Sequence, residues 1–242
     1  MNFENKIYVI SGASSGIGRS CVDLLLKNGA IIIGLDINNS EIINNNYKHY
    51  IVDVTSEDNL FQIIEGLEKQ YNKINGLINC AGSFSSLKPF YEMSYEEWNK
   101  VISINLTGTF LLSKFISRIM IKNMSGKIVN ISCIRSKIFR PNMADYAASK
   151  GGIISLTSAM ALDLSKFNIQ VNSVAPGFTY TGMTSESFDN PETKKMSENL
   201  IPNGKIAMPE DMSKVVIFLL SDSSDYINGE TIFVDGGYGI FK

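Results

Sequence analysis

Hydrophobic residues divide the chain into short apolar runs separated by longer segments with a helical repeat. The runs are rich in Ile and Val and span only a few residues each, which is typical of buried strands. They lie at positions 7–10, 31–35, 50–52, 76–79, 127–131, 169–174 and 231–234.

In the segments between the runs, apolar residues recur every three or four positions, which predicts helices. The predicted helices span 17–26, 59–67, 98–120, 144–164 and 209–220. The last begins with Pro209 and two acidic residues, a favourable start because proline loses no hydrogen bond there and acids suit the helix dipole. The alternation predicts an α/β fold, a doubly wound parallel seven-stranded sheet with helices on both faces.

The alternation continues without a linker rich in Pro, Gly or Ser, so we expect a single domain spanning residues 1–242. Only the segment 182–205 departs from it, because this segment is polar and its apolar residues are isolated. We interpret it as a surface excursion, either a mobile lid over the substrate or an ordinary exposed loop.

Composition narrows the classes of function. Hydrophobic residues make up 44% of the 242 positions and charged residues 19%, which is too apolar and too weakly charged for a disordered chain. A net charge of −2 gives no reason to expect nucleic acid or a membrane surface as a partner. No apolar run approaches the roughly eighteen residues of a membrane span, and the N-terminus lacks the features of a signal peptide. We therefore expect a soluble, cytoplasmic domain.

Metal-binding residues are scarce. The chain has 3 cysteines without a paired spacing, which argues against a disulfide framework or a zinc knuckle. Its 1 histidine, His49, argues against a histidine-based metal site and against a Ser-His-Asp triad. We expect no metal, and we expect an acid or base other than histidine.

A glycine-rich segment stands between the first predicted strand and the first predicted helix. Its spacing, G-x-x-x-G-x-G, allows a tight turn, and the following helix offers free N–H groups to a pyrophosphate. A turn with a purely structural role is the alternative. No Gly-Lys-Ser/Thr sequence is present, which disfavours a P-loop nucleotidase. The candidate cofactor residues here are Gly12, Ser14, Ser15, Gly16, Ile17 and Gly18.

Asp36 lies at the end of the second predicted strand, with Ile37 beside it. A carboxylate at this place can accept hydrogen bonds from both ribose hydroxyls of adenosine, and it would repel a 2′-phosphate. No Arg or Lys follows closely to bind a phosphate. Asp36 therefore favours NAD(H) over NADP(H). The alternative is a carboxylate that only caps the next turn.

Tyr146 and Lys150 are four positions apart in the predicted helix 144–164, which places both side chains on one face. A nearby ammonium stabilises a phenolate and lowers the pKa of the tyrosine, so Tyr146 is a candidate general acid/base. Taken alone, the pair also fits an ordinary surface contact.

Together, these motifs resemble the short-chain dehydrogenase/reductase family over essentially the full chain. The glycine loop and the pair of Tyr146 and Lys150 match the family's cofactor loop and catalytic pair, and the segment 234–237 matches its last strand. The other matching residues occur in the family's order, namely Asp53 and Val54, then Asn79, Ala81 and Gly82, then Asn105, then Pro176, Gly177, Thr179 and Thr181.

The resemblance implies a Rossmann fold and hydride transfer between a nicotinamide cofactor and a secondary alcohol or ketone. It implies that Tyr146 exchanges a proton with the substrate oxygen, and that Lys150 lowers the pKa of Tyr146 and holds the nicotinamide ribose. It implies that Asn105 connects Lys150 to solvent through a water. It implies that Asp53 and Val54 contact the adenine. It also implies a homo-oligomer, either a dimer or a two-fold tetramer.

The chain departs from the family at the serine that polarises the substrate oxygen. Counting thirteen residues back from the tyrosine reaches Cys133, and the serine present, Ser132, is one residue earlier. Because neighbours on a strand point to opposite faces, we expect Cys133 to occupy the serine site as a weak donor. Loss of a strong donor to an oxyanion costs about 3 kcal/mol. The alternatives are a local shift that brings in Ser132 or Ser136, and a substrate oriented by its other groups.

Arg135 follows shortly after Cys133 and, if it points inward, can pair with a carboxylate or with vicinal hydroxyls. A solvated basic loop is the alternative. With the polar segment 182–205, Arg135 favours a small polar substrate such as a sugar, a polyol or a hydroxy acid. One alternative is a 3-oxoacyl-thioester (acyl-carrier-protein) reductase, against which Asp36 argues. The other is a non-catalytic cofactor-binding regulator, against which the intact catalytic residues argue.

Overall fold

Seven parallel strands form one sheet in the order β3-β2-β1-β4-β5-β6-β7. The computed structural model describes residues 2–240, so Met1 and positions 241–242 of the predicted domain lie outside the described residues. The α/β fold predicted from the alternation is confirmed. The strands are β1 (Ile7–Ser11), β2 (Ile31–Asp36), β3 (Tyr47–Ile51), β4 (Gly76–Asn79), β5 (Gly126–Ile131), β6 (Ile169–Pro176) and β7 (Thr231–Val234).

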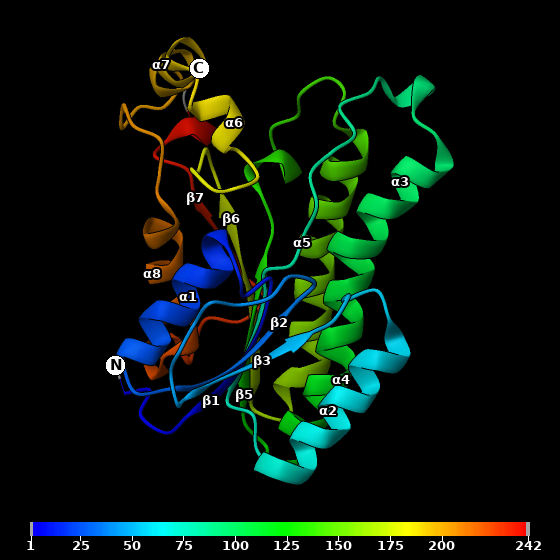
Figure 1. Cartoon of the computed structure of the whole chain (residues 1–242), viewed down its shortest axis with the longest axis vertical. Helices are drawn as coiled ribbons and strands as arrows, with labels where there is room; N and C mark the ends of the chain where they lie inside the picture. The colour runs from blue at the N-terminus through cyan, green and yellow to red at the C-terminus, as the bar shows by residue number, and fades with distance from the viewer. Residues whose placement is uncertain (1, 241–242) are drawn as a thin grey trace.

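Helices cover both faces of the sheet (Figure 1), with α1 and α8 on one side and α2, α4 and α5 on the other. Successive residues of a strand face opposite helical layers, so Val9 belongs to the core under α2 and α4 and Ile10 to the core under α1 and α8. In the sheet, Val9 lies level with Ile33 of β2 and Leu77 of β4. The long helices are α1 (Gly16–Lys27), α2 (Glu57–Tyr71), α3 (Tyr95–Ile102), α4 (Gly108–Lys122), α5 (Ala144–Ser165) and α8 (Pro209–Leu220).

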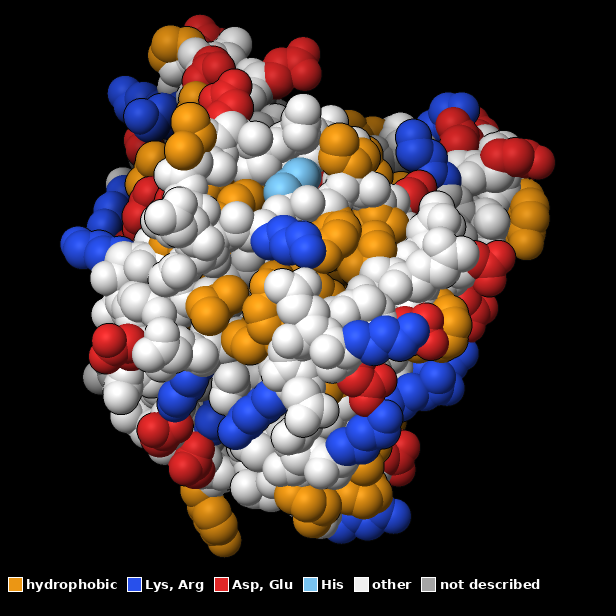
Figure 2. All heavy atoms as spheres, turned by 60° about the horizontal axis from the view of Figure 1, so that its bottom comes forward, with side chains coloured by type: hydrophobic (Ala, Val, Ile, Leu, Met, Phe, Trp, Pro, Cys, Tyr) orange, Lys and Arg blue, Asp and Glu red, His pale blue; other side chains and the backbone are white. Residues whose placement is uncertain are grey.

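Strand β3 begins three residues before the predicted apolar run. It is an edge strand, and within residues 2–240 it pairs only with β2. An edge strand carries polar side chains, here Lys48 and His49, which an apolar run does not detect. Figure 2 shows one face of the molecule, on which hydrophobic side chains gather near the middle while most charged side chains lie toward the edges. The His49 ring bonds to the Tyr47 hydroxyl and to the carbonyl oxygen of Asn38, both at 2.9 Å.

The helix predicted over 98–120 begins at Tyr95, where Ser94 and Glu97 form a capping box, and a π-turn at Ser103–Thr107 divides it into α3 and α4. In the described part of the chain, the run Tyr95–Lys122 is the one helix whose length and mean hydropathy of 1.2 would suit a membrane span. Because 56% of that window is buried and α4 packs on the sheet, the run serves as a core helix.

The segment predicted as a surface excursion contains two short helices, α6 (Ser185–Phe188) and α7 (Pro191–Asn199). The side chain of Asn190 accepts hydrogen bonds from two backbone N–H groups of α7, and Pro191 starts the helix. Phe188 is buried against Ile201 and Ile206. These helices lie above the carboxyl ends of β6 and β7 (Figure 1).

Candidate active site

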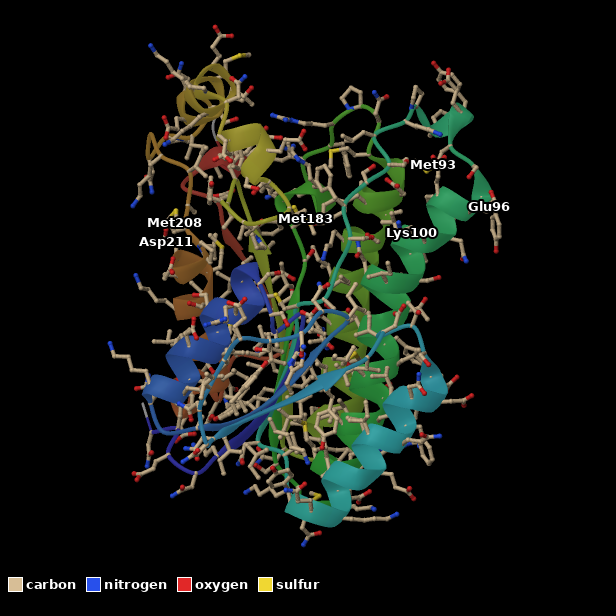
Figure 3. The ribbon with its side chains drawn as sticks, viewed as in Figure 1. Met93, Glu96, Lys100, Met183, Met208 and Asp211 are labelled. Atoms are coloured by element: carbon tan, nitrogen blue, oxygen red, sulfur yellow. The ribbon has the colours of Figure 1, made fainter. Side chains whose placement is uncertain are left out.

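A cleft of about 660 Å³ is lined by the segments that follow β1, β2, β4, β5 and β6, by α5 and by the segment with α6 and α7. In a doubly wound sheet, ligands bind at the carboxyl ends of the strands where the strand order reverses, here between β1 and β4. Lys100 from α3 and Met183 from the segment after β6 lie on opposite sides of this cleft (Figure 3).

The loop after β1 and the loop after β4 are in close contact at the reversal point. A Cβ atom on Gly12 would lie 2.8 Å from the backbone nitrogen of Ala81, and one on Gly18 would lie 2.1 Å from the carbonyl oxygen of Gly12. Gly12 and Gly16 also have positive φ angles of +67° and +53°. Side chains are therefore excluded, and bare backbone forms this wall of the cleft.

Helix α1 begins directly behind this loop, with Ser15 as its N-cap. The Ser15 side chain makes no capping hydrogen bond within the described chain, and the first turn carries no acidic residue. The first N–H groups of the helix are thus available to an anion, which the positive end of the helix dipole would also favour. The loop and helix terminus fit the pyrophosphate of a dinucleotide.

Asp36 ends β2 beside the glycine loop and is 8% exposed. Its Oδ2 accepts a hydrogen bond from the backbone N–H of Ser14 at 3.0 Å, and its Oδ1 accepts one from the N–H of Asn38 at 2.9 Å. Asp36 also lines the cleft, beside Ile37. The carboxylate therefore caps the turn after β2, fixes the glycine loop and still faces the space where a cofactor ribose would bind.

Helix α5 brings Tyr146 and Lys150 to the opposite end of the cleft. Nζ of Lys150 lies 5.7 Å from the centre of the Tyr146 ring and donates a hydrogen bond to the carbonyl oxygen of Ile131 at 2.8 Å. Both side chains are buried, with exposures of 8% and 5%. The ring of Phe84 packs on Tyr146 with centres 5.4 Å apart. This geometry suits proton transfer in a site shielded from water.

Burial raises the pKa of Tyr146 well above its ordinary value, and the charge and hydrogen bonding of Cys133 add to this effect. The positive charge of Arg135 lowers that pKa. Burial also lowers the pKa of Lys150. The expectation that Lys150 lowers the pKa of Tyr146 stays a prediction, and Arg135 is a second cation whose charge acts in that direction.

Cys133 and Ser132 point to different sides of the backbone, as strand geometry requires. The Ser132 hydroxyl donates to the backbone oxygen of Lys150 at 2.8 Å, whereas Cys133 packs against Tyr146 at the cleft. The Ser136 hydroxyl donates to the carbonyl oxygen of Cys133 at 2.6 Å. Both serine hydroxyls are therefore engaged by backbone, and the thiol is the group beside the tyrosine.

Arg135 is buried, with an exposure of 6%, and it lines the cleft. Its Nη1 donates to the carbonyl oxygen of Ile138 at 3.2 Å. Its guanidinium carbon lies 5.6 Å from the ring centre of Phe178 and 5.8 Å from that of Tyr238. The structure thus disfavours the alternative of a solvated basic loop for Arg135, although Arg140 nearby is exposed.

A family model described as enoyl-(acyl carrier protein) reductase matches residues 12–239. The 3-oxoacyl-acyl-carrier-protein reductase FabG of Thermotoga maritima is 35% identical over 246 residues, covering 98% of this chain and 99% of that protein. This chain belongs to the short-chain dehydrogenase/reductase family. It is therefore an oxidoreductase that acts on CH–OH groups with a nicotinamide cofactor.

Other members of this family that are similar to the chain are named for different substrates. The NAD-dependent glycerol dehydrogenase of Listeria innocua is 33% identical, covering 99% of this chain and 96% of that protein. The ligand-free aldohexose dehydrogenase of Thermoplasma acidophilum is 30% identical with a TM-score of 0.93, covering 99% of this chain and 96% of that one. Family membership therefore establishes the reaction type and leaves the substrate open.

The cleft is not lined by four of the residues that were predicted for the site, namely Ser14, Gly18, Asn79 and Asn105. Asn79 was expected to contact the cofactor, but its amide nitrogen donates to Ser113 and Asn130, both at 2.8 Å, and so joins β4 to α4 and β5. The predicted residues that do line the cleft are Gly12, Ser15, Gly16, Ile17, Asp36, Ile37, Asp53, Val54, Ala81, Gly82, Ser132, Cys133, Arg135, Tyr146, Lys150, Pro176, Gly177, Thr179 and Thr181.

Asn105 lies in the π-turn and is fully buried behind the cleft. Its amide nitrogen donates to Ser149 Oγ at 3.0 Å and to the Ser83 carbonyl at 3.1 Å, and its Oδ1 accepts from the Ser83 N–H at 2.7 Å. The Thr109 hydroxyl donates to the Asn105 carbonyl oxygen at 2.7 Å. The widened turn thus aims Asn105 at the loop after β4, where it fixes the backbone next to Gly82.

Asp145 is a residue of the site that sequence reasoning missed. It is fully buried, and it accepts hydrogen bonds from Ser85 Oγ at 2.6 Å and from the Ser86 and Tyr146 backbone N–H groups at 3.2 and 2.7 Å. It therefore ties the loop that carries Phe84 to the start of α5. The available signal was an acidic residue in the first turn of that helix, next to Tyr146.

Proposed function

We propose that this protein interconverts a secondary alcohol and a ketone with NAD(H), acting on a small polar substrate such as a sugar, a polyol or a hydroxy acid. The observation that carries the proposal is that a single cleft holds the glycine loop with Asp36 at one end and Tyr146 with Lys150 at the other. The first set suits a dinucleotide, and the second suits proton exchange with an oxygen atom.

Charge at the glycine-loop end supports NAD(H) over NADP(H). The acidic residues that line the cleft are Asp36 and Asp53, and both lie at this end. No described Lys or Arg lines the cleft from the segments that follow β1, β2 and β3. A 2′-phosphate would therefore meet a carboxylate without a compensating cation, whereas a free ribose would find hydrogen-bond acceptors.

In the proposed mechanism, Tyr146 takes the hydroxyl proton of the alcohol during oxidation and returns it to the ketone oxygen during reduction. The nicotinamide, when bound, accepts or supplies the hydride. The Lys150 ammonium, held by the carbonyl of Ile131, would bind the cofactor ribose beside the tyrosine. Phe84 and the rest of the apolar lining exclude water from Tyr146.

Cys133 takes the place of the serine that would donate to the substrate oxygen. Its thiol contacts Tyr146, and no hydroxyl of Ser132 or Ser136 replaces it. A thiol is a weak donor, so stabilisation of the developing oxyanion rests largely on Tyr146 itself. We therefore expect slower turnover than a serine at this position would allow.

The segment 182–205 serves in this proposal as the substrate lid. Thr181, Met183 and Phe188 from this side line the cleft, and the Tyr180 hydroxyl donates to Asp189 at 2.7 Å, which braces the start of the segment. Its helix α7 is mostly polar, which suits a polar substrate. We further propose that the protein is a homo-oligomer, since α4 and α5 expose the apolar side chains of Phe110 and Leu162. We also propose that it is cytoplasmic, with no nucleic-acid or membrane partner.

The second candidate is a 3-oxoacyl-thioester reductase, which the named activity of the Thermotoga maritima relative favours. The two candidates are separated by one assay set. Cofactor binding is measured by fluorescence titration with NADH and NADPH, and turnover is measured on sugars, polyols and hydroxy acids with NAD and on acetoacetyl thioester with NADH and NADPH. Tighter binding of NADPH, with turnover of the thioester alone, would favour the second candidate. Tight cofactor binding without any turnover would favour a regulator.

A further inference from the structure

Arg135 carries a buried positive charge that the protein itself does not neutralise. It is 6% exposed, and no carboxylate among residues 2–240 lies within ion-pair distance of it. A guanidinium has five N–H donors, and the hydrogen bond to the Ile138 carbonyl uses only one of them. The faces of Phe178 and Tyr238 offset part of the charge. The remaining donors lack a partner within the described chain.

The charges that line the cleft are separated along its length. The acidic residues, Asp36 and Asp53, lie at the glycine-loop end. Beyond that end, the charged lining residues are all basic, namely Lys100, Arg135, Arg140 and Lys150. Arg140 also approaches the Phe178 ring, with its guanidinium carbon 5.3 Å from the ring centre. The substrate end of the cleft is therefore positively charged, which favours an anion there.

Arg135 is also close to the reacting group. It lies two residues beyond Cys133, whose side chain packs against Tyr146. Its positive charge opposes the rise in the pKa of Tyr146 that burial causes, and both residues line the same cleft. An anion bound to Arg135 would therefore lie near the hydroxyl or keto group that exchanges a proton with Tyr146.

We propose that Arg135 binds a carboxylate of the substrate, so that the substrate is a small hydroxy acid and the product its oxo acid. The planar fork of a guanidinium matches a carboxylate through two parallel hydrogen bonds, and burial strengthens such a pair. This inference rests on the proposed function and selects one of its substrate classes over neutral sugars and polyols. In oxidation, the alcohol loses its hydroxyl proton to Tyr146 and a hydride to NAD, and the carboxylate takes no part in bond changes.

The competing explanation is structural, since Arg135 also connects Phe178 to Tyr238 in the C-terminal segment. In that case, replacement would lower stability without changing the preference among substrates. Matched pairs of substrates separate the two explanations. Lactate is compared with methyl lactate, and 3-hydroxybutyrate with its methyl ester, with NAD as cofactor in the wild type and in Arg135→Gln, Arg135→Lys and Lys137→Gln. Lys137 is the control because it is exposed on the same turn and does not line the cleft.

For the better pair, we expect kcat/KM for the acid to exceed that for the ester by about 30-fold in the wild type and in Lys137→Gln. The ratio should fall to near one in Arg135→Gln, mainly through a higher KM for the acid. Arg135→Lys keeps the charge but loses the fork, so its ratio should be intermediate. A thermal melt of each variant shows whether it folds.

Equal kcat/KM for acid and ester in the wild type would overturn the proposal, as would a ratio that Arg135→Gln leaves unchanged. A sugar phosphate is assayed beside the acids, and a higher kcat/KM for it than for either acid would also overturn the proposal. If no member of the panel turns over, binding of the same acids to the NADH-bound protein is measured by calorimetry. The inference is overturned if the acids do not bind, or if they bind equally well to the wild type and to Arg135→Gln. Full turnover by Tyr146→Phe would instead refute the proposed function, a separate outcome.

Discussion

At the glycine-loop end of the cleft the backbone forms the binding surface, whereas at the Tyr146 end side chains form it. Gly12 and Gly18 allow loop segments to approach within distances that no side chain permits, and Asp36 is fixed by two backbone N–H groups. At the other end, the chemistry depends on individual side chains such as Cys133 and Arg135.

This difference explains why the ligand of the glycine-loop end can be predicted more closely than the ligand of the Tyr146 end. A backbone wall with free helix N–H groups suits one chemical group, a pyrophosphate, and tolerates few substitutions. A side-chain wall on the same frame can suit many substrates. The similar proteins with known names illustrate this, since they include a reductase of acyl thioesters and dehydrogenases of glycerol and aldohexoses.

The largest effect is expected from Tyr146→Phe at the side-chain end. Removing the phenolic oxygen eliminates the proposed acid/base, so kcat should fall by roughly 1,000-fold or more while the Kd for NADH changes less than about threefold. Steady-state kinetics and fluorescence titration measure the two quantities. Tyr180→Phe, which removes a hydroxyl at the lid instead, is the matched control. An active Tyr146→Phe enzyme would contradict the mechanism.

A comparable loss at the backbone end should follow from Gly12→Ala. The new Cβ would lie 2.8 Å from the Ala81 nitrogen at a φ of +67°, so we expect NADH affinity to fall by about 100-fold and stability by about 1–3 kcal/mol. Gly66→Ala is the control, because a Cβ there meets nothing within 4 Å and α2 should gain about 0.5–1 kcal/mol. Fluorescence titration measures the NADH affinity and thermal melts measure the stability. Unchanged NADH binding in Gly12→Ala would refute the claim that the glycine loop and the loop after β4 need this close backbone contact to bind the cofactor.

Asp36→Asn tests cofactor choice with a smaller effect. Asparagine keeps one acceptor oxygen for the loop but loses the charge, so the preference for NADH over NADPH should fall by about tenfold. Asp58→Asn on α2, an exposed carboxylate outside the cleft, should leave the preference unchanged. The ratio of the two dissociation constants is the measurement. A ratio that Asp36→Asn does not change would assign Asp36 to loop capping alone.

The smallest effects are shifts in pH dependence at the side-chain end. Oxidation needs the Tyr146 phenolate, so kcat/KM should rise with pH through the pKa of Tyr146. Cys133 and Cys80 raise that pKa and Arg135 lowers it, while Lys150 is the other charged group beside the ring. The inflection should therefore move to lower pH in Cys133→Ser and to higher pH in Arg135→Gln.

Turnover in Cys133→Ser should be kept or raised, by up to about tenfold, because a hydroxyl is the stronger donor. Kinetics across a pH series at saturating NAD measure both the inflection and the plateau. Shifts of both variants in the same direction would show that the charges around Tyr146 are misassigned. Complete loss of activity in Cys133→Ser would show that the thiol has a specific role.

The sequence predicted the sheet and most helices because buried strands and amphipathic helices have distinct apolar periods. It misplaced β3, where an edge strand needs no apolar face, and it missed α7, whose stability starts from a cap at Asn190 rather than from an apolar stripe. Spacing also predicted the glycine loop and the position of Cys133. The burial of Arg135 and the bonds of Asp145 could not be predicted, because they depend on segments far apart in the chain.

The central claim is that Tyr146 and Asp36 serve one NAD-dependent alcohol oxidation in one cleft. The most direct measurement is the initial rate of NADH formation from NAD and a panel of hydroxy acids, polyols and sugars, run beside Tyr146→Phe. We predict that the wild type reduces NAD with at least one of these alcohols and that Tyr146→Phe does not. Activity confined to NADPH and acetoacetyl thioester, or equal rates in the wild type and Tyr146→Phe, would contradict the account.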